Sequence, residues 1–316
     1  MTLGKTSAIQ IENCVSCEFD EEGEKGMKIL LCRYTQIGSR GDMLLATPVF
    51  KALKERYPQC HITVYTAPHL AVIIKGNPYI DEITCKMPSK FKFDRIIYLD
   101  YIKLSNVLHI IDAFGINAHL KLIDKKPYIY LGKEHLKEAK RFRDTCGIHK
   151  HDLAIAIHMG PTWPERMWFK ERYIEVAEYF KRHYNAKFIE LSQFEGMGMG
   201  IGIDITGKTS IHQTAAILKG CKLLLCVDSF VLHLASAVDT PTVALFGCTN
   251  PQMRLPFNDV SIAPDTPSKC RYCYHWDQTR LSNLCIRDRI YCMESITSES
   301  VIQAMEELLI KTGSIK

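Results

Sequence analysis

Residues 221–251 contain two short apolar runs with a helical pattern between them, and this unit constrains the fold more than any other stretch. The first run, 222–227, has too few polar residues for a half-exposed strand, which indicates a strand buried in a parallel sheet. Apolar residues at helical spacing follow, a Thr-Pro pair ends the helix, and 242–246 is a second buried strand. The stretch therefore predicts a strand–helix–strand unit of an α/β fold.

Three polar residues gather where the first of these strands ends. Asp228 and Ser229 suit a helix N-cap, because their side-chain oxygens can accept hydrogen bonds from the free amides of the first turn. His233 follows one turn later, and on its own it is best interpreted as a core histidine packed under the helix. Open α/β sheets bind ligands at the carboxyl ends of their strands, and a helix N-terminus attracts anions. The stretch thus predicts a site for an anion such as a diphosphate.

The amino-terminal part of the chain begins with a similar unit. Residues 28–34 form an apolar run, a loop with two glycines follows, and a helical pattern covers 43–57. The loop lacks the GxGxxG spacing of dinucleotide-binding proteins. Pro48 lies either in the first turn of a helix capped by Thr47 or slightly inside a helix that begins at Asp42. Asp42 has two interpretations: a helix cap, which the spacing alone favours, or a general base at the carboxyl edge of the strand.

Strands and helices go on alternating along the chain, which is typical of doubly wound sheets. The pattern restarts at the apolar run 153–158, so we predict an α/β protein of two Rossmann-like doubly wound domains that face a central cleft. Clefts between domains are common ligand sites. The predicted divisions are a flexible acidic tail at 1–26, an amino-terminal domain at 27–149, a carboxyl-terminal domain at 150–297, and a final helix at 298–316 that crosses back toward the first domain.

Composition restricts the environment and the partners. With 47% hydrophobic and 24% charged residues, the chain has the make-up of a soluble protein, and no apolar run approaches the roughly 18 residues of a membrane span. The N-terminus lacks the features of a signal peptide, so a cytoplasmic location is expected. A net charge of +5 is too weak to indicate nucleic acid as a partner. Residues 86–103 mix Lys and Arg with Phe and Tyr, as solvated faces do and, less often, surfaces that bind anionic substrates or membranes.

Three motifs together resemble glycosyltransferase family 9, the ADP-heptose:lipopolysaccharide heptosyltransferases. The first is Gly-Asp-Met-Leu-Leu-Ala-Thr-Pro at 41–48, similar to the family's GD-x-LL-x-TP. The second is Arg166-x-Trp168, where the family usually has Lys-x-Trp. The third begins at Asp228 and continues at 245–251, similar to the family's D-[ST]-G-x-x-H-LA and LFG-x-T-x-P. The order and spacing of the three motifs imply the two-domain GT-B fold.

The resemblance implies roles for single residues, carried over position by position. Asp42 becomes the general base that accepts the proton of the acceptor hydroxyl, and this replaces the helix-cap interpretation. The hydroxyl displaces a nucleotide diphosphate from the anomeric carbon with inversion, while cations and helix amides hold the diphosphate, so no cofactor is expected for catalysis. The implied donor-binding residues are Thr162, Arg166, Glu195, Asp228, Ser229 and His233.

We therefore expect an inverting glycosyltransferase that moves a heptose, or a similar sugar, from a nucleotide donor such as ADP-heptose to a lipopolysaccharide core or related glycan. The acceptor is expected on the amino-terminal domain, where Arg33, Arg40 and the basic-aromatic run could meet acidic sugars or phosphates, with peripheral contact at the inner face of the inner membrane. Two alternatives stay open: a protein-directed heptosyltransferase and a non-catalytic nucleotide-sugar-binding or scaffold protein. Phe230 favours the scaffold, because the family has there a glycine that lets the backbone approach the donor. Asp42 argues against it, because a scaffold needs no base.

Four cysteines precede the final helix: Cys270, Cys273, Cys285 and Cys292. Together they could hold a structural zinc or iron ion in tetrahedral thiolate geometry, as a knuckle over 270–292. Six residues rather than two separate the second pair, and the alternatives are reduced thiols or a disulfide. Disulfides are rare in cytosolic proteins, so a structural metal is preferred.

Overall fold

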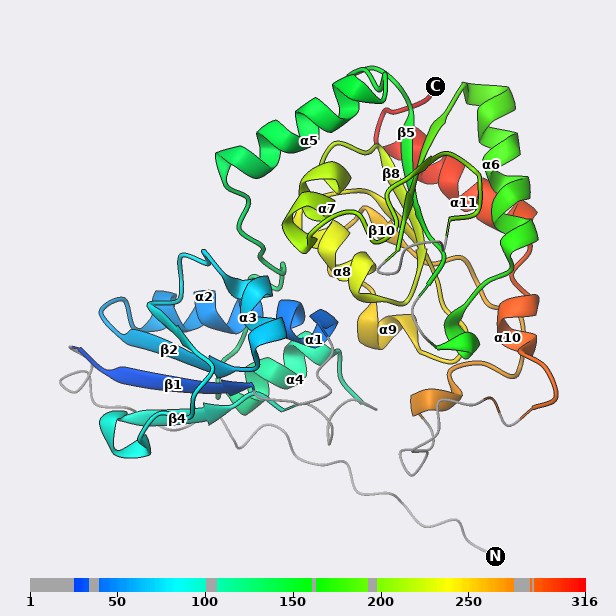
Figure 1. The fold of residues 1–316 in the computed structure, drawn as a ribbon. Coiled ribbons are helices and arrows are strands. Elements are labelled where there is room, and N and C mark those ends of the chain that lie inside the picture. The colour runs from blue at the N-terminus through cyan, green and yellow to red at the C-terminus, as the bar shows by residue number, and fades with distance from the viewer. Residues whose placement is uncertain are drawn as a thin grey trace, which may run out of the picture.

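Two parallel sheets, one in each half of the chain, organise the molecule (Figure 1). The computed structural model describes residues 26–33, 40–100, 107–160, 163–192, 198–275, 285 and 287–316. Apart from Gly26, the acidic tail predicted at 1–26 therefore lies outside the described residues.

The sheet of the first half has four strands in the order β3-β2-β1-β4, all parallel. Ile29 lies opposite Ile62, and Leu31 lies opposite Val64, which fixes the register of β1 on β2. All four side chains are fully buried, as expected for central strands of a parallel sheet. The strands are β1 (Lys28–Arg33), β2 (His61–Thr66), β3 (Glu82–Thr84) and β4 (Arg95–Tyr98).

The helical elements of the first half are α1 (Arg40–Leu45), α2 (Thr47–Arg56), α3 (Pro68–Ile74), the 3₁₀ turn η3 (Lys90–Lys92) and α4 (Ile110–Asn117). The interpretation that Pro48 lies in the first turn of a helix is confirmed, and the helical pattern at 43–57 is divided between α1 and α2. Pro48 lies in the first turn of α2 and has no N–H for the carbonyl of Leu44, which accepts the hydroxyl of Thr47 at 2.6 Å instead. Thr47 is thus the first helical residue and not the cap.

The sheet of the second half has six parallel strands in the order β10-β9-β8-β5-β6-β7. The chain starts at the centre with β5, winds outward to one edge, returns to the centre at β8 and winds to the other edge, which is the doubly wound order. The edge strands β7 and β10 were not predicted, because two residues carry no detectable periodicity. The strands are β5 (Ala154–His158), β6 (Lys187–Leu191), β7 (Ile203–Asp204), β8 (Leu223–Val227), β9 (Thr242–Leu245) and β10 (Ser261–Ile262).

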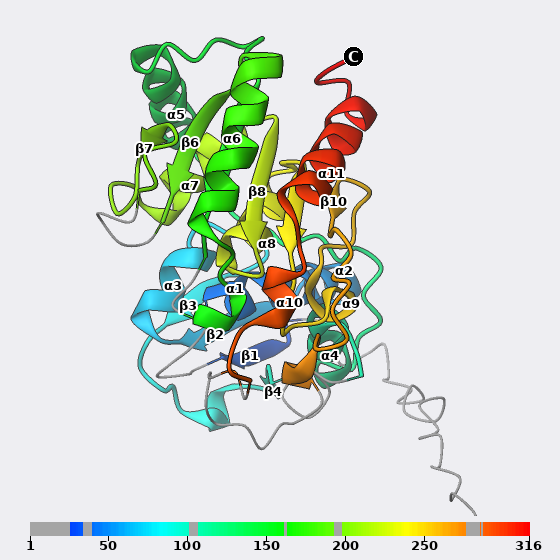
Figure 2. The ribbon, with the colours of Figure 1, turned by 90° about the vertical axis from the view of Figure 1, so that its right-hand side faces the viewer.

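The helical elements of the second half are α5 (Lys133–Thr145), η5 (Pro164–Arg166), α6 (Lys170–Tyr184), α7 (Ile211–Leu218), α8 (Phe230–Ala237), α9 (Pro251–Arg254), η6 (Cys273–His275), α10 (Tyr291–Glu294) and α11 (Ser298–Lys311). The last of them, α11, packs against α6 and β9 (Figure 2). The prediction that the final helix crosses back toward the first domain is therefore wrong. Val301 and Leu308 are buried in one apolar cluster with Phe180 of α6, and this burial keeps α11 on the second sheet.

Helix α5 connects the two halves and lies on the second one (Figure 1). It packs against α7, where the Glu138 carboxylate accepts a hydrogen bond from the Gln213 side chain at 3.1 Å. His135 of α5 stacks on His212 of α7, with ring centroids 5.0 Å apart. The boundary predicted after residue 149 would place α5 in the first domain, whereas its contacts with α7 are made with the second.

The two halves share one hydrophobic core. A single cluster of buried apolar side chains contains Leu44 of α1 and Phe50 of α2 together with Leu232 and Leu234 of α8. Helix α1 packs directly against α8, at the point where the two halves meet. The junction brings together α1, which carries Asp42, and the N-terminus of α8, which follows the polar end of β8.

Candidate functional site

Asp42 lies beyond the carboxyl end of β1, in the first turn of α1. Its Oδ2 accepts a hydrogen bond from Arg33 Nη2 at 3.1 Å. Arg33 is only 7% exposed, donates from Nη1 to the Leu99 carbonyl at 2.8 Å, and lies 5.3 Å from the centre of the Phe114 ring. Arg33 therefore orients the Asp42 carboxylate. Arg40 begins α1 and is partly exposed; contact of either arginine with an acceptor stays a prediction.

Asp228 and Arg166 form an ion pair at the carboxyl end of β8. Arg166 Nη1 lies 3.3 Å from Asp228 Oδ2, and the side chains of Arg166 and Asp228 are 16% and 3% exposed. Burial alone would raise the pKa of Asp228, but the positive charges of Arg166 and Arg254 hold it below its ordinary value. Asp228 is therefore ionised at neutral pH. The structure thus brings together two residues that the resemblance assigns to donor binding.

The N-terminus of α8 has no side-chain cap, so the prediction that Asp228 or Ser229 caps it is wrong. Ser229 occupies the capping position, but its hydroxyl is buried and has no hydrogen-bond partner among the described residues. Buried polar atoms are costly when unpaired, so such an atom beside free helix amides marks a place for a ligand. Phe230, the first residue of α8, packs against the shared core.

Two buried histidines lie on either side of the junction between the halves. Burial is the main cause that lowers the pKa of His233 in α8 to about 3 and that of His109, at the start of α4, to about 4. Both rings are therefore neutral at pH 7. His109 Nδ1 accepts the N–H of Ile111 at 3.2 Å, so its Nε2 carries the hydrogen and donates to the carbonyl of Leu255 at 3.1 Å. This bond ties the first half to the residue that follows α9.

Arg254 is the residue of this site that sequence reasoning missed. It ends α9, is 7% exposed, and its charge acts on both Asp228 and His233. The available signal was its position three residues after Pro251, the last residue of the third motif. A single helical turn has no periodicity from which burial can be predicted.

Two of the predicted donor residues, Thr162 and Glu195, lie outside the described residues. The chain just before Thr162 is constrained by Gly160, which has a φ of 138°. A Cβ at Gly160 would approach Val227 Cγ2 to 3.0 Å, so only glycine fits where the turn after β5 passes the end of β8.

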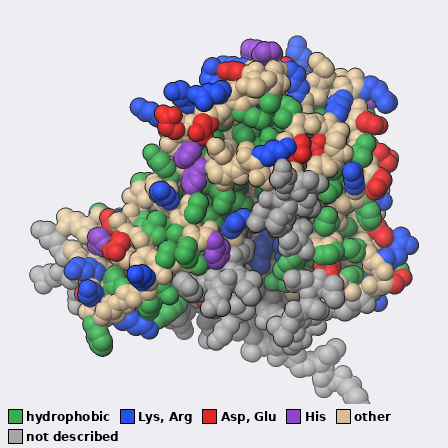
Figure 3. Space-filling view, viewed as in Figure 1, with side chains coloured by type: hydrophobic (Ala, Val, Ile, Leu, Met, Phe, Trp, Pro, Cys, Tyr) green, Lys and Arg blue, Asp and Glu red, His purple; other side chains and the backbone are tan. Residues whose placement is uncertain are grey.

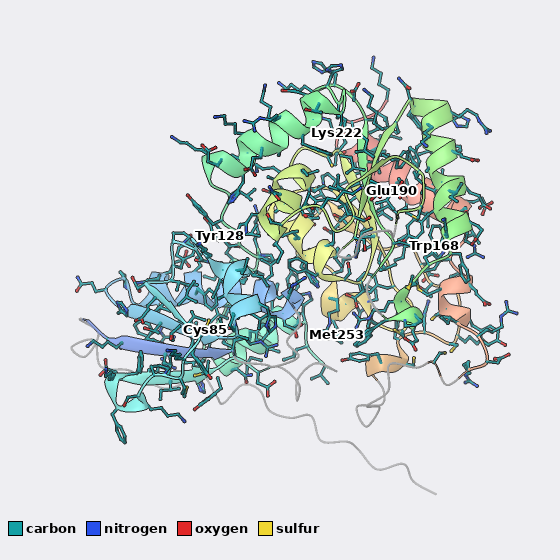
Figure 4. The ribbon with its side chains drawn as sticks, in the orientation of Figure 1. Cys85, Tyr128, Trp168, Glu190, Lys222 and Met253 are labelled. Carbon is teal, nitrogen blue, oxygen red and sulfur yellow. The ribbon has the colours of Figure 1, made fainter. Side chains whose placement is uncertain are left out.

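Buried anchors hold the loops beside the site. Glu190 of β6 accepts hydrogen bonds from the amides of Met199 and Gly202, the latter at 2.7 Å, and so fixes the chain that returns after the loop with Glu195. Trp168 of the second motif lies between α6 and α10 (Figure 4) and donates its indole N–H to the Ile296 carbonyl at 3.0 Å. Trp168 therefore ties its own loop to the residues just before α11. Arg166 of the same motif faces Asp228.

In the described part of the chain, none of the cysteines of the predicted knuckle forms a disulfide, and the four lie near one another. Burial, with a contribution from Cys270, Cys273 and Cys285, raises the pKa of the Cys292 thiol to about 12. Thiolates would suit zinc or iron. Within the described ranges, however, no three Cys, His, Asp or Glu side chains are placed to hold one ion. Metal binding by the four cysteines stays a prediction.

Comparisons with known proteins point to one family. Residues 109–279 match the family model of glycosyltransferase family 9 (heptosyltransferase). Lipopolysaccharide heptosyltransferase 3 of Escherichia coli is 23% identical over 276 residues, which covers 66% of this chain and 81% of that protein. Lipooligosaccharide heptosyltransferase 2 of Haemophilus influenzae is 33% identical over 148 residues, which covers 42% of this chain and 43% of that protein.

Solved structures share the fold. A glycosyltransferase family 9 protein of Veillonella parvula has a TM-score of 0.73 at 24% identity and covers 91% of this chain and 98% of its own. ADP-heptose lipopolysaccharide heptosyltransferase II of E. coli has a TM-score of 0.65 at 15% identity, with 91% and 100% covered. The iron-containing dodecameric glycosyltransferase TibC of enterotoxigenic E. coli has a TM-score of 0.71 at 15% identity, with 91% and 77% covered. The predicted GT-B fold is confirmed.

Proposed function

The chain belongs to glycosyltransferase family 9 and is a glycosyltransferase, and from this premise we propose that it transfers a heptose, or a similar sugar, from ADP-heptose to a hydroxyl of a lipopolysaccharide core. The names of two similar proteins support the sugar and the acceptor. One observation carries the proposal: buried polar atoms without a described hydrogen-bond partner lie at the uncapped N-terminus of α8, namely Arg166 Nε, Ser229 Oγ and His233 Nδ1. A diphosphate on the helix amides would find its partners there.

Asp42 is the proposed general base. Because α1 packs against α8, an acceptor hydroxyl bound at their junction would lie between the carboxylate and the donor. As the acceptor oxygen bonds to the anomeric carbon, its proton passes to Asp42, and the bond from that carbon to the diphosphate oxygen breaks. Attack opposite the leaving group inverts the anomeric configuration. Arg33 keeps the carboxylate in position.

Positive charge is proposed to stabilise the departing diphosphate. Arg166 and the amides of α8 would contact its oxygens, and Arg254 would add charge from behind. Asp228 would repel a phosphate, so its proposed task is to balance and orient the two arginines. No step of this mechanism uses a metal ion.

A donor panel tests the proposal. ADP-heptose should raise the melting temperature of the protein more than GDP- or UDP-sugars do. When a lipopolysaccharide core acceptor is added, ADP should be released. NMR of the product should show that the anomeric configuration has been inverted. Transfer to a protein acceptor instead would favour the protein-directed alternative. Binding without release for any acceptor would indicate a non-catalytic protein. No response to any nucleotide sugar would contradict the proposal as a whole.

One surface of the first domain supports peripheral contact with a membrane. Among the helices that the structure describes, none has the length and apolarity to cross a bilayer. The turn between β3 and β4 presents Phe91, which is 102% exposed, and Met87 among the exposed Lys86, Lys90 and Lys92. Hydrophobic and basic side chains lie together at this end of the first domain (Figure 3). An aromatic ring surrounded by cations suits an anionic bilayer, where the ring enters the interface and the lysines meet phosphates.

Replacing Phe91 by Ser should weaken binding to vesicles of phosphatidylethanolamine and phosphatidylglycerol by about tenfold, because the ring no longer leaves water. Co-sedimentation measures this binding. Ile123→Ser is the matched control, since Ile123 is 94% exposed but lies outside the turn, and it should bind as the wild type does. Equal binding by Phe91→Ser and the wild type would rule out this surface as the membrane contact.

A further inference from the structure

Residues 270–275, here called the cysteine-bearing segment, carry Cys270 and Cys273. Tyr274 of this segment lies beside Arg166 of the proposed donor site. The guanidinium carbon of Arg166 lies 3.9 Å from the centre of the Trp163 ring and 5.8 Å from that of Tyr274. The two rings are themselves 5.6 Å apart, at an angle of 53°. Both distances to the cation fall within the roughly 6 Å over which a ring attracts it. Trp163 and Tyr274, here called the aromatic pair, therefore act together on one guanidinium.

The segment that carries Tyr274 is fixed to the second sheet. Three consecutive carbonyls after β9 accept its hydrogen bonds: Phe246 from the Thr266 hydroxyl at 2.6 Å, Gly247 from the Tyr272 N–H at 2.9 Å, and Cys248 from the Tyr274 N–H at 3.0 Å. Tyr272, directly before η6, has a φ of 59°, a left-handed conformation that L-residues rarely adopt. Such strain persists only where the surroundings impose it. The fold thus holds Tyr274 at a set place beside Arg166.

We propose that Tyr274 is a positioning residue of the donor site: with Trp163 it holds the plane of Arg166 so that the arginine can bind the diphosphate. Arg166 Nη1 contacts Asp228, whereas its Nε is buried and lacks a partner in the described part of the chain. A guanidinium can stack on a ring and still donate within its own plane. Phosphate oxygens in that plane would therefore meet an oriented donor.

The aromatic pair also accounts for the arginine at position 166, where glycosyltransferase family 9 usually has lysine. An ammonium group is a compact, strongly hydrated charge and cannot stack as a plane. The slot between Trp163, Tyr274 and Asp228 thus favours a guanidinium. The cysteine-bearing segment becomes one wall of the donor site, because Tyr274 follows Cys273 directly. This inference rests on the proposed function of the same site.

Titration calorimetry with ADP tests the inference. Tyr274→Leu should weaken ADP binding about fivefold and raise the KM for ADP-heptose, with kcat changed by less than about twofold, because the lost cation–π contact acts on binding. Tyr274→Phe should bind as the wild type does, since the ring and not the hydroxyl is required. Tyr291→Leu is the matched control: Tyr291 is 39% exposed and contacts Arg289 at 5.2 Å, away from the site.

A double-mutant cycle separates positioning from a general loss of structure. Arg166→Lys should weaken ADP binding about fivefold in the wild type and hardly at all in Tyr274→Leu, because the slot is already lost. Additive effects, or unchanged binding by Tyr274→Leu, would overturn the inference. If Tyr274→Leu melts early, Trp163→Leu gives the same test from the other ring. Failure of the wild type to bind ADP would refute the proposed function itself, which the variants alone cannot do.

Discussion

Replacing Asp42 by Asn should lower kcat by roughly a thousandfold while ADP-heptose still binds, because the amide keeps the shape of the carboxylate but cannot accept a proton. The acceptor hydroxyl is then left as a poor nucleophile. Steady-state release of ADP measures the rate, and thermal shift with ADP-heptose measures donor binding. The loss should appear in kcat and kcat/KM alike, as for an interaction made only in the transition state.

The matched control for this variant is Asp112→Asn. Asp112 also forms an ion pair and lies in α4 of the same half, but its partner is Lys125, at 2.7 Å, and not a residue to which the proposed mechanism gives a role. Its substitution should leave kcat unchanged. Retention of more than about a tenth of the wild-type kcat by Asp42→Asn would show that another group takes the proton.

Replacing Asp228 by Asn should lower the free energy of unfolding by about 3 kcal/mol, because Arg166 and Arg254 then lose their buried counter-charge. The unusual part of this prediction is rescue by ligand. ADP should raise the melting temperature of the variant more than that of the wild type, since the diphosphate supplies the missing negative charge and no carboxylate repels it.

Urea unfolding with and without ADP measures both effects. Asp152→Asn is the control, because Asp152 pairs with Lys187 at 2.7 Å near the surface, where losing one partner of an ion pair changes the free energy of unfolding little. An Asp228→Asn variant as stable as the wild type, or one that ADP stabilises less than it stabilises the wild type, would contradict the account of Asp228 as a counter-charge.

The central strands of both sheets could be predicted from the sequence, because strands buried on both faces are continuous apolar runs such as residues 223–227. Local patterns carry no information on where an amphipathic helix docks. The position of α11 was therefore predicted wrongly: it lies on α6 and not across the first domain. At the break between α1 and α2, Pro48 has no N–H to donate to the Leu44 carbonyl, and the Thr47 hydroxyl donates to it instead, which periodicity does not register.

The residues of the candidate site were also predicted only in part. The motifs gave Asp228 and Arg166, and the fold brings these two together. Arg254 and Tyr274 were missed, because their roles depend on contacts between loops far apart in the chain. The cap assigned to Ser229 failed for a related reason: its residue type suits a cap, but in the structure its hydroxyl does not bond the helix.

The proposed chemistry and the stability of the fold depend on the same buried side chains. Leu44, two residues from Asp42, and Leu232, three residues from Ser229, belong to the same buried cluster, and their helices are in contact. In the proposed mechanism, the spacing between the base and the leaving group is therefore set by the same apolar contacts that join the two halves. A substitution among the side chains at this junction would therefore change both the rate and the stability. The junction should tolerate fewer substitutions than the core of either sheet. Under the proposed mechanism, repacking the side chains between α1 and α8 would also change the distance from the base to the donor, and with it the rate.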